Sequence, residues 1–243
     1  MEIYGQFAQI YNQFIEAPYL QWANYIEKIW AKFGTKPNLV LDLACGTGVL
    51  TNILSNRGYD MIGVDLSVEM LAVAQRTNPK ILFLQQDMRK FELYGSVDAI
   101  VCTCDSLNYI LDNKQLEQVF KQAEFYLNPK GMMIFDINTE YKYSKILADN
   151  NFSSVSKTGA YIWENSYDET KARNQYQVTF FIGEHDKLYS RYEEIHIQKA
   201  HKPEEIKNAL SAAKLNLIGE FDELTFNPPH NHSERVFFVA QKL

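Results

Sequence analysis

This chain of 243 residues has few cysteines, no long apolar run and no excess of basic residues. The three cysteines, Cys45, Cys102 and Cys104, are too few for a disulfide framework, so we expect a reducing compartment, the cytoplasm. No segment approaches the roughly 18 consecutive apolar residues that a membrane span requires. No basic stretch leads into an apolar one near residue 1, so we expect neither a membrane anchor nor a secretory signal.

Basic residues are outnumbered, and repeated or low-complexity segments are absent from the sequence. There are 24 Lys and Arg residues against 30 Asp and Glu residues, which gives a net charge of −6. Contacts to nucleic-acid phosphates need clustered basic side chains. We therefore predict a small-molecule partner, no membrane partner, and RNA modification as the weaker alternative. Since no Pro-, Gly- or Ser-rich linker divides the chain, we predict one domain over residues 1–243.

Strand-like and helix-like segments alternate in the first half of the chain. Apolar runs at 39–44, 59–65, 81–87, 97–104 and 132–137 are separated by stretches with helical periodicity. Ser67 and Asp112 are placed to cap two of these helices, and Pro203 suits the first turn of a later one. This alternation predicts right-handed crossovers and a parallel sheet covered on both faces.

The pattern changes between about residues 161 and 199, where polar and aromatic residues alternate. The segments YIWENSY, NQYQVTFFIG and KLYSRYEEIHIQKA predict an antiparallel meander. A helix and two strands, at 215–224 and 235–242, complete the chain. We predict an N-terminal helical segment at 1–36, a cofactor-binding core at 37–138, an inserted lid at 139–200, and the C-terminal part of the core sheet at 201–243.

A glycine-containing turn between the first strand and the helix that follows has the strongest chemical signal. It runs from Asp42 to Gly48 as DLACGTG, and Asp65 stands at the end of the second strand. Glycines there let a ligand approach the backbone closely, and the helix N-terminus adds partial positive charge. An acid such as Asp65 can bind both hydroxyls of a ribose.

Two kinds of ligand compete for this turn. A dinucleotide fingerprint needs G-x-G-x-x-G, but Thr51 stands where the third glycine belongs and opposes the close packing that pyrophosphate binding uses. The acid at Asp42 suits a ligand that carries an ammonium group rather than a phosphate. A nucleoside joined to an amino acid, without pyrophosphate, describes S-adenosylmethionine.

The segments LDLACGTG, GVDLSVEML, QQDM and CDSLNY resemble motifs of class I S-adenosylmethionine-dependent methyltransferases over about residues 37–138. YGQFAQIYNQF, WENSYD and RYEEIHIQKAH resemble a narrower group of small bacterial methyltransferases of unassigned substrate. The resemblance implies an α/β fold with a Rossmann-like doubly wound seven-stranded sheet. That sheet is mostly parallel with an antiparallel last strand, and an antiparallel β lid is inserted. It also implies S-adenosylmethionine as the cofactor.

The same resemblance implies roles for individual residues. Backbone groups of Ala44, Gly46 and Gly48 hold the methionine portion of the cofactor, Asp42 orients its ammonium, and Asp65 binds the ribose hydroxyls. The other implied contacts are Leu66 and Met70 beside the adenine, Asp87 and Met88 on its amine and ring nitrogen, Thr103 and Cys104 by the sulfonium, and Tyr11 over the methionine end.

Several of these residues have a structural alternative. Asp87 is also placed to cap a turn before MRKFELYG, and Met70 and Met88 are also suited to filling the core. Tyr11 also fits an amphipathic docking helix.

A zinc site would have to combine Cys102 and Cys104 with His230 and His232. Neither pair has a spacing of the C-x₂-C type, so we expect no metal.

Candidate acceptor contacts follow the fourth and fifth strands, where the crevice of such sheets opens. In similar small-molecule amine methyltransferases the position that matches Asp105 faces the acceptor, and an acid there favours a cationic or amine substrate. Ser106, Asn108 and Asn138 are further candidates in the same crevice.

The predicted lid contributes a second set of candidates. In RYEEIHIQ, strand alternation puts Tyr192, Glu194 and His196 on one face. His196 beside Glu194 is a candidate base or substrate contact, and a packed or solvent-facing histidine is the alternative.

We therefore predict an enzyme that transfers the methyl group of S-adenosylmethionine in line to a small polar acceptor, with an amine among the candidates. Asp105 and His196 are the predicted catalytic residues. Orientation can contribute roughly 7–11 kcal/mol in favourable cases, so a general base is optional. A non-catalytic S-adenosylmethionine-binding module and an NAD(P)-dependent oxidoreductase are the alternatives.

Overall fold

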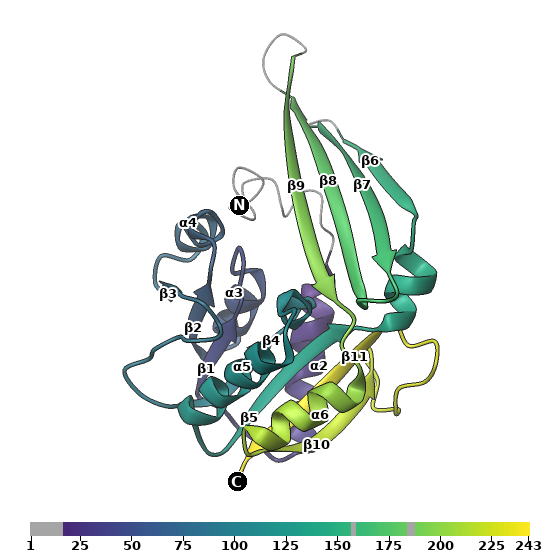
Figure 1. The fold of residues 1–243 in the computed structure, drawn as a ribbon. Helices are drawn as coiled ribbons and strands as arrows, with labels where there is room; N and C mark the ends of the chain where they lie inside the picture. The colour runs from purple at the N-terminus through teal and green to yellow at the C-terminus, as the bar shows by residue number, and fades with distance from the viewer. Residues whose placement is uncertain (1–16, 157–158, 184–187) are drawn as a thin grey trace.

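The computed structural model describes residues 17–156, 159–183 and 188–243, which form two β-sheets with helices around the larger one (Figure 1). The first elements are α2 (Tyr19–Lys32), β1 (Leu39–Leu43), α3 (Val49–Asn56), β2 (Asp60–Asp65), α4 (Val68–Thr77), β3 (Leu82–Gln85) and β4 (Val97–Cys102). Next come η2 (Ser106–Tyr109), α5 (Asn113–Tyr126), β5 (Leu127–Asn138) and η3 (Lys142–Leu147). The last are β6 (Asn151–Val155), β7 (Gly159–Asp168), β8 (Arg173–Gly183), β9 (Tyr189–Lys199), α6 (Pro203–Ala212), β10 (Leu215–Asp222) and β11 (Arg235–Lys242).

The larger sheet has seven strands in the order β10-β11-β5-β4-β1-β2-β3. β1 pairs in parallel with β2 and β4, and β5 pairs in parallel with β4. β11, the last strand in the chain, lies between β10 and β5 and is antiparallel to both. The predicted Rossmann-like sheet with an antiparallel last strand is therefore confirmed. Its strand order reverses between β1 and β4, where ligands bind in open sheets of this kind.

Local sequence signals set the ends of several helices as predicted. The Ser67 hydroxyl accepts a hydrogen bond from the Met70 N–H (3.2 Å) and caps α4. Asp112 accepts from the N–H groups of Lys114 and Gln115 at the start of α5. Pro203 is the first residue of α6, where its missing N–H is not needed.

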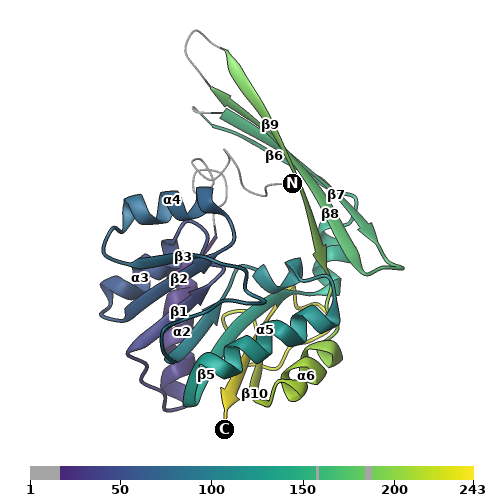
Figure 2. The same cartoon turned by 60° about the vertical axis from the view of Figure 1, so that its left-hand side comes forward.

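Helices cover both faces of the larger sheet (Figure 2). α5 and α6 pack on one face through residues such as Phe120 and Leu210, and α2 and α3 pack on the other through residues such as Ile26 and Leu54. The inner strands β1, β4 and β5 are consequently buried on both sides, which explains their nearly continuous apolar sequences.

The smaller sheet, which we call the lid, consists of β6, β7, β8 and β9 in that order. All its strand pairs are antiparallel, so the predicted meander is confirmed for β7, β8 and β9. The sequence does not predict β6, because all five of its residues are exposed and NFSSV lacks polar–apolar alternation. The lid stands over one end of the larger sheet, and β9 contacts η2 there (Figures 1 and 2).

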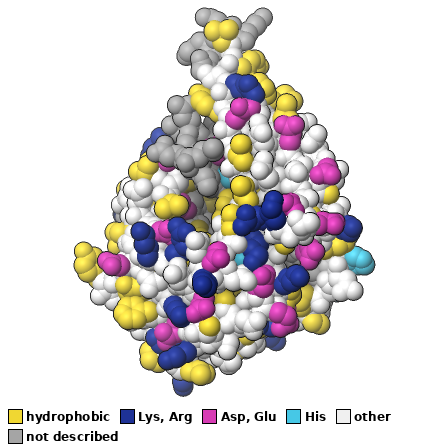
Figure 3. All heavy atoms as spheres, in the orientation of Figure 1, with side chains coloured by type: hydrophobic (Ala, Val, Ile, Leu, Met, Phe, Trp, Pro, Cys, Tyr) yellow, Lys and Arg dark blue, Asp and Glu magenta, His cyan; other side chains and the backbone are white. Residues whose placement is uncertain are grey.

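Acidic and basic side chains are interspersed on the face of the molecule shown in Figure 3. Across residues 17–156, 159–183 and 188–243, every helix is too short or too polar to cross a membrane.

Candidate active site

The turn from β1 into α3 is built from left-handed backbone conformations. Ala44, Gly46 and Gly48 have φ values of 62°, 54° and 72°, and the Gly48 N–H donates to the Cys45 carbonyl at 2.9 Å. A Cβ added at Gly48 would lie 3.0 Å from the Cβ of Ala74, whereas a Cβ added at Gly46 would meet nothing within 4 Å. Gly48 therefore allows the turn to pack, and Gly46 leaves its backbone open.

Asp65 ends β2 beside this turn. Its carboxylate accepts hydrogen bonds from the backbone N–H groups of Gly46 (2.8 Å) and Ser67 (2.9 Å). Burial raises the pKa of Asp65, and the backbone donors oppose that shift. A carboxylate has about four acceptor positions, so some remain for hydroxyl donors of a ligand.

Asp42 is buried near the end of β1, where the Thr51 hydroxyl donates to its Oδ2 at 2.6 Å. Desolvation raises the pKa of Asp42 to about 7, and the hydrogen bond from Thr51 opposes the shift. Thr51 occupies the position of the third glycine in a dinucleotide fingerprint. Its hydroxyl instead holds a carboxylate that a cationic ligand would keep ionised.

A cavity of about 690 Å³, the first cavity, opens beside these residues. Most of the residues that the resemblance assigns to the cofactor line it. They are Asp42, Ala44, Gly46, Asp65, Leu66, Met70, Asp87, Met88, Thr103 and Cys104. Gly48 is not among the lining residues, and its Cα faces Ala74 and Phe83. Tyr11 lies outside the described residues.

Asp87 forms an ion pair that the sequence does not predict. Its Oδ1 and Oδ2 lie 2.9 and 3.0 Å from Arg89 Nε, and Oδ2 also contacts Nη2. The Arg89 N–H donates to Asp87 Oδ1 as well, which is the turn-capping contact of the structural alternative. The hydrogen bond from the guanidinium lowers the pKa of Asp87. Its carboxylate is therefore charged, oriented and in contact with the first cavity.

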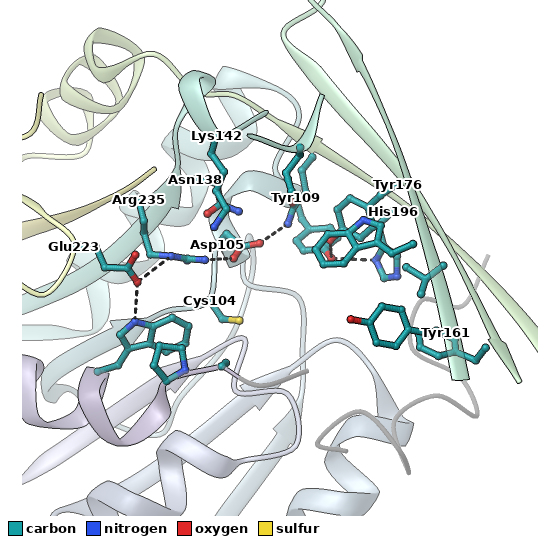
Figure 4. Close-up of a pocket in the computed structure, with 18 residues that line it drawn as sticks. Cys104, Asp105, Tyr109, Asn138, Lys142, Tyr161, Tyr176, His196, Glu223 and Arg235 are labelled. Atoms are coloured by element: carbon teal, nitrogen blue, oxygen red, sulfur yellow. Dashed lines mark hydrogen bonds and ion pairs between the residues drawn. The ribbon is translucent and has the colours of Figure 1, made fainter. Parts of the chain in front are cut away.

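A second cavity, of about 410 Å³, lies between the larger sheet and the lid (Figure 4). Cys104 and Tyr109 line both cavities, so the two spaces adjoin at these residues. Cys104 and Asp105 have φ values of 62° and 50°, a conformation that is costly outside glycine and clusters at functional sites. The lid supplies an aromatic wall formed by Tyr161, Trp163, Tyr176 and Phe180.

Arg235 organises the carboxylates on one side of the second cavity. Its Nη2 donates to Asp105 Oδ1 at 2.8 Å, and its Nε lies 3.5 Å from Glu223 Oε1 (Figure 4). Its Nη1 donates to the buried carboxylate of Asp136. Gln198 Nε2 donates to the other oxygen of Asp105 at 2.7 Å. Side chains from β9 and β11 thus fix the orientation of Asp105. The sequence predicts Asp105 as a site residue but does not predict Arg235.

His196 lies on the second-cavity side of β9 within a chain of hydrogen bonds. Its Nε2 is 3.1 Å from Glu194 Oε2 and its Nδ1 is 3.0 Å from the Tyr109 hydroxyl, which is 2.7 Å from that of Tyr176. A carboxylate only accepts hydrogen bonds, so Nε2 carries the proton in the neutral ring and Nδ1 accepts from Tyr109. Glu194 and His196 share a face, as strand alternation predicts. The sequence does not predict Tyr109.

The other predicted acceptor contacts have structural partners. Asn108 Nδ2 donates to the carbonyls of Asn138 (3.1 Å) and Lys199 (2.8 Å), and its Oδ1 accepts from the Asn138 N–H. Ser106 Oγ donates to the Thr103 carbonyl at 2.7 Å. Asn138 lines the second cavity and Ser106 the first, whereas Asn108 lines neither and joins η2 to β5 and the lid.

The cysteines and histidines weighed above for zinc lie apart. Cys102 is buried on β4, whereas His230 and His232 lie together between β10 and β11. In the part of the chain that the structure describes, no three His, Cys, Asp or Glu side chains are grouped so as to hold a metal ion.

The chain is similar in sequence to known methyltransferases. A family model described as a methyltransferase domain matches residues 40–131. The chain is 35% identical to "Putative methyltransferase YqeM" of Bacillus subtilis (strain 168), over 99% of this chain and 97% of that protein. It is 22% identical to a dTDP-3-amino-3,6-dideoxy-alpha-D-glucopyranose N,N-dimethyltransferase of Streptomyces fradiae, over 88% of this chain and 85% of that protein.

A solved structure extends the match to three dimensions. An S-adenosylmethionine-dependent methyltransferase from Clostridium acetobutylicum ATCC 824 aligns with a TM-score of 0.88 at 31% identity, and the alignment covers 98% of each chain. The similarity in sequence and in fold extends over the full length of the chain. It agrees with the strand order and with the glycine-containing turn described above. The chain belongs to the S-adenosylmethionine-dependent methyltransferases, enzymes that use S-adenosylmethionine as their cofactor.

Proposed function

We propose that this enzyme methylates the nitrogen of a small amine. The observation that carries the proposal is the junction of the two cavities at Cys104 and Tyr109, where Tyr109 is hydrogen-bonded to His196. A proton acceptor thus stands where a cofactor in the first cavity and an acceptor molecule in the second would meet. The similarity to an amino-sugar N,N-dimethyltransferase supports an amine as the acceptor.

The first cavity suits S-adenosylmethionine through its set of donors and acceptors. The open backbone at Gly46 allows close approach by the methionine portion, Asp42 offers a carboxylate to its ammonium, and Asp65 retains acceptor positions for the ribose. In this proposal the remaining contacts are Leu66 and Met70 beside the adenine, Asp87 and Met88 on its polar edge, and Thr103 and Cys104 near the sulfonium.

Bound S-adenosylmethionine supplies a methyl group whose leaving group is already activated. The residues of this chain then have to orient the acceptor, exclude water and remove one proton. Tyr161 and Trp163 of the aromatic wall offer apolar surface to the carbon skeleton of the acceptor. Asp105, held by Arg235, offers a fixed carboxylate to a cationic group.

An amine that binds in its protonated form must lose one proton before its lone pair can attack the methyl group, and the hydrogen-bond chain at His196 can accept that proton. Tyr109 passes its hydroxyl hydrogen to His196 Nδ1 as it takes the hydrogen that leaves the amine. Glu194, 3.1 Å from Nε2, stabilises the imidazolium that forms. The Tyr176 hydroxyl, 2.7 Å from that of Tyr109, stabilises the tyrosine oxygen during the transfer. The proton ends on His196, and Tyr109 lies between His196 and the reacting nitrogen.

A competition screen tests this proposal. Small amines, amino sugars among them, are paired with analogues in which a hydroxyl replaces the amino group, and each pair is incubated with isotope-labelled S-adenosylmethionine. We expect mass spectrometry to find the label in the amine of a productive pair and not in its hydroxyl analogue. Transfer to hydroxyl or carboxylate acceptors in preference to every amine would contradict the proposal.

A further inference from the structure

Strand β9 presents one face to each cavity. His196 and Gln198 line the second cavity, whereas Ile195 and Ile197 line the first, because side chains alternate along a strand. β9 is an edge strand of the lid and lies on the side toward α4 in Figure 1. It is therefore a wall that the two cavities share.

Ile195 and Ile197 are large apolar residues that remain partly exposed. Their exposed fractions are 38% and 40% within the described chain. They face a cavity whose lining also includes the apolar side chains of Leu66 and Ile110. A ligand with an apolar or aromatic portion would remove part of this surface from water, which is favourable.

Three hydrogen bonds join the C-terminal end of β9 to residues 105–109, the segment that follows β4. Asn108 donates to the Lys199 carbonyl at 2.8 Å, Gln198 donates to Asp105 at 2.7 Å, and His196 contacts Tyr109. Ile195 and Ile197 flank His196, so a ligand that packs against both adds attachments on either side of it.

We infer that Ile195 and Ile197 bind the cofactor, and that cofactor binding thereby positions His196 in the second cavity. The inference rests on the proposed role of the first cavity. The isoleucines act as positioning residues, because they affect His196 through the strand that carries all three. Coupling of this kind is reciprocal, so an acceptor that contacts His196 and Gln198 also strengthens cofactor binding.

The test uses Ile195→Thr/Ile197→Thr, which removes apolar surface but keeps the β-branched shape that strands favour. Ile162→Thr is the matched control, since Ile162 is 42% exposed in the same sheet and lines neither cavity. S-adenosylhomocysteine is titrated by calorimetry, and hydrogen exchange of residues 189–199 is followed with and without it. Asp65→Ala reports independently on the role of the first cavity.

We expect the double variant to bind S-adenosylhomocysteine about tenfold more weakly, a change of about 1.4 kcal/mol. We expect it to lose most of the protection that the ligand gives to β9, while Ile162→Thr stays within about twofold of the original chain. Unchanged affinity and protection in the double variant, with binding lost in Asp65→Ala, would overturn this inference alone. Equal weakening by Ile162→Thr would also overturn it. Undiminished binding by Asp65→Ala would overturn the assignment of the first cavity, and the inference with it.

Discussion

Glu193 and Glu194 are neighbours on β9 with opposite surroundings. Glu194 lies 3.1 Å from His196 Nε2, whereas Glu193 is exposed on the other face and pairs with Arg191. We predict that His196→Gln lowers kcat by about 10²–10⁴-fold, the usual contribution of a general base. Glu194→Gln should lower kcat by about tenfold, because the imidazolium loses a charged partner.

Steady-state kinetics and S-adenosylhomocysteine titration check this prediction. Glu193→Gln is the control and should leave kcat within about twofold, in line with a change at the surface. All three variants should keep their affinity for S-adenosylhomocysteine. Equal losses of kcat in Glu193→Gln and Glu194→Gln would remove the role assigned to Glu194, and an unchanged kcat in His196→Gln would remove the role assigned to His196.

Asp42 should make stability depend on pH. Its pKa is about 7 in the folded chain and about 3.9 in an unfolded one, so the folded chain binds the extra proton between these values. The free energy of unfolding therefore falls as pH rises from about 4 to 7, by at most about 4 kcal/mol from this group, and levels off above pH 7. Asp42→Asn keeps an acceptor for Thr51 but cannot ionise.

Denaturant unfolding of both proteins at pH 5 and pH 8 measures this effect. We predict that Asp42→Asn gains stability relative to the original chain as pH rises, since titration of the other groups is common to both. S-adenosylhomocysteine, whose ammonium favours the ionised carboxylate, should bind the original chain more tightly at pH 8 than at pH 6. Parallel stability curves for the two proteins would contradict the shifted pKa.

The sequence could identify Asp105 and His196 as site residues, but it could not identify the distant side chains that pair with them. Asp65 ends one strand and Thr103 follows another, and both stand inside recognisable segments. Tyr109 and His196 are 87 positions apart, and Asp105 and Arg235 are 130 apart. One signal for Arg235 was present: it directly precedes the apolar run VFFVA, and a charged side chain that is buried with such a strand needs a partner.

The two glycines in the turn between β1 and α3, Gly46 and Gly48, have different structural roles. Both Gly46 and Gly48 have positive φ, but only Gly48 is crowded, with Ala74 and Phe83 near the site of an added Cβ. We predict that Gly46→Ala costs about 1–2 kcal/mol of stability, from the left-handed backbone alone. Gly48→Ala should cost about 1–3 kcal/mol more, because α4 and β3 must shift.

Thermal or denaturant unfolding of the two ligand-free variants measures this difference. Asn52→Ala, a substitution at a half-buried position in α3, controls for general sensitivity of the helix. Similar stability for Gly46→Ala and Gly48→Ala would show that packing at Gly48 contributes little.

Periodicity predicted most strands and helices but not their contacts. The alternation in β9 indicated which side chains share a face, and the caps at Ser67 and Asp112 were predicted from local chemistry. β6 escaped prediction because it is an exposed edge strand, which has no buried face to impose alternation. That β9 divides two cavities depends on how the lid sits over η2, and strand periodicity carries no such information.

Folding of the whole chain brings segments that are distant in sequence to one end of the larger sheet. The second cavity takes residues from α2, from the end of β4, from the lid and from β11. The seven-stranded sheet follows from the order of strands and helices in the sequence, so the first cavity was predictable in outline. The second was not, because it forms only where the inserted lid meets that sheet.

Methyl transfer across the junction at Cys104 and Tyr109 is tested most directly by ¹³C NMR. The enzyme is incubated with S-adenosylmethionine carrying a ¹³C-methyl group and with an amine from the screen. We predict that the S-methyl signal disappears as an N-methyl signal grows in equal measure, and that His196→Gln slows both changes together. An O-methyl signal, or loss of the S-methyl signal without an N-methyl product, would contradict it.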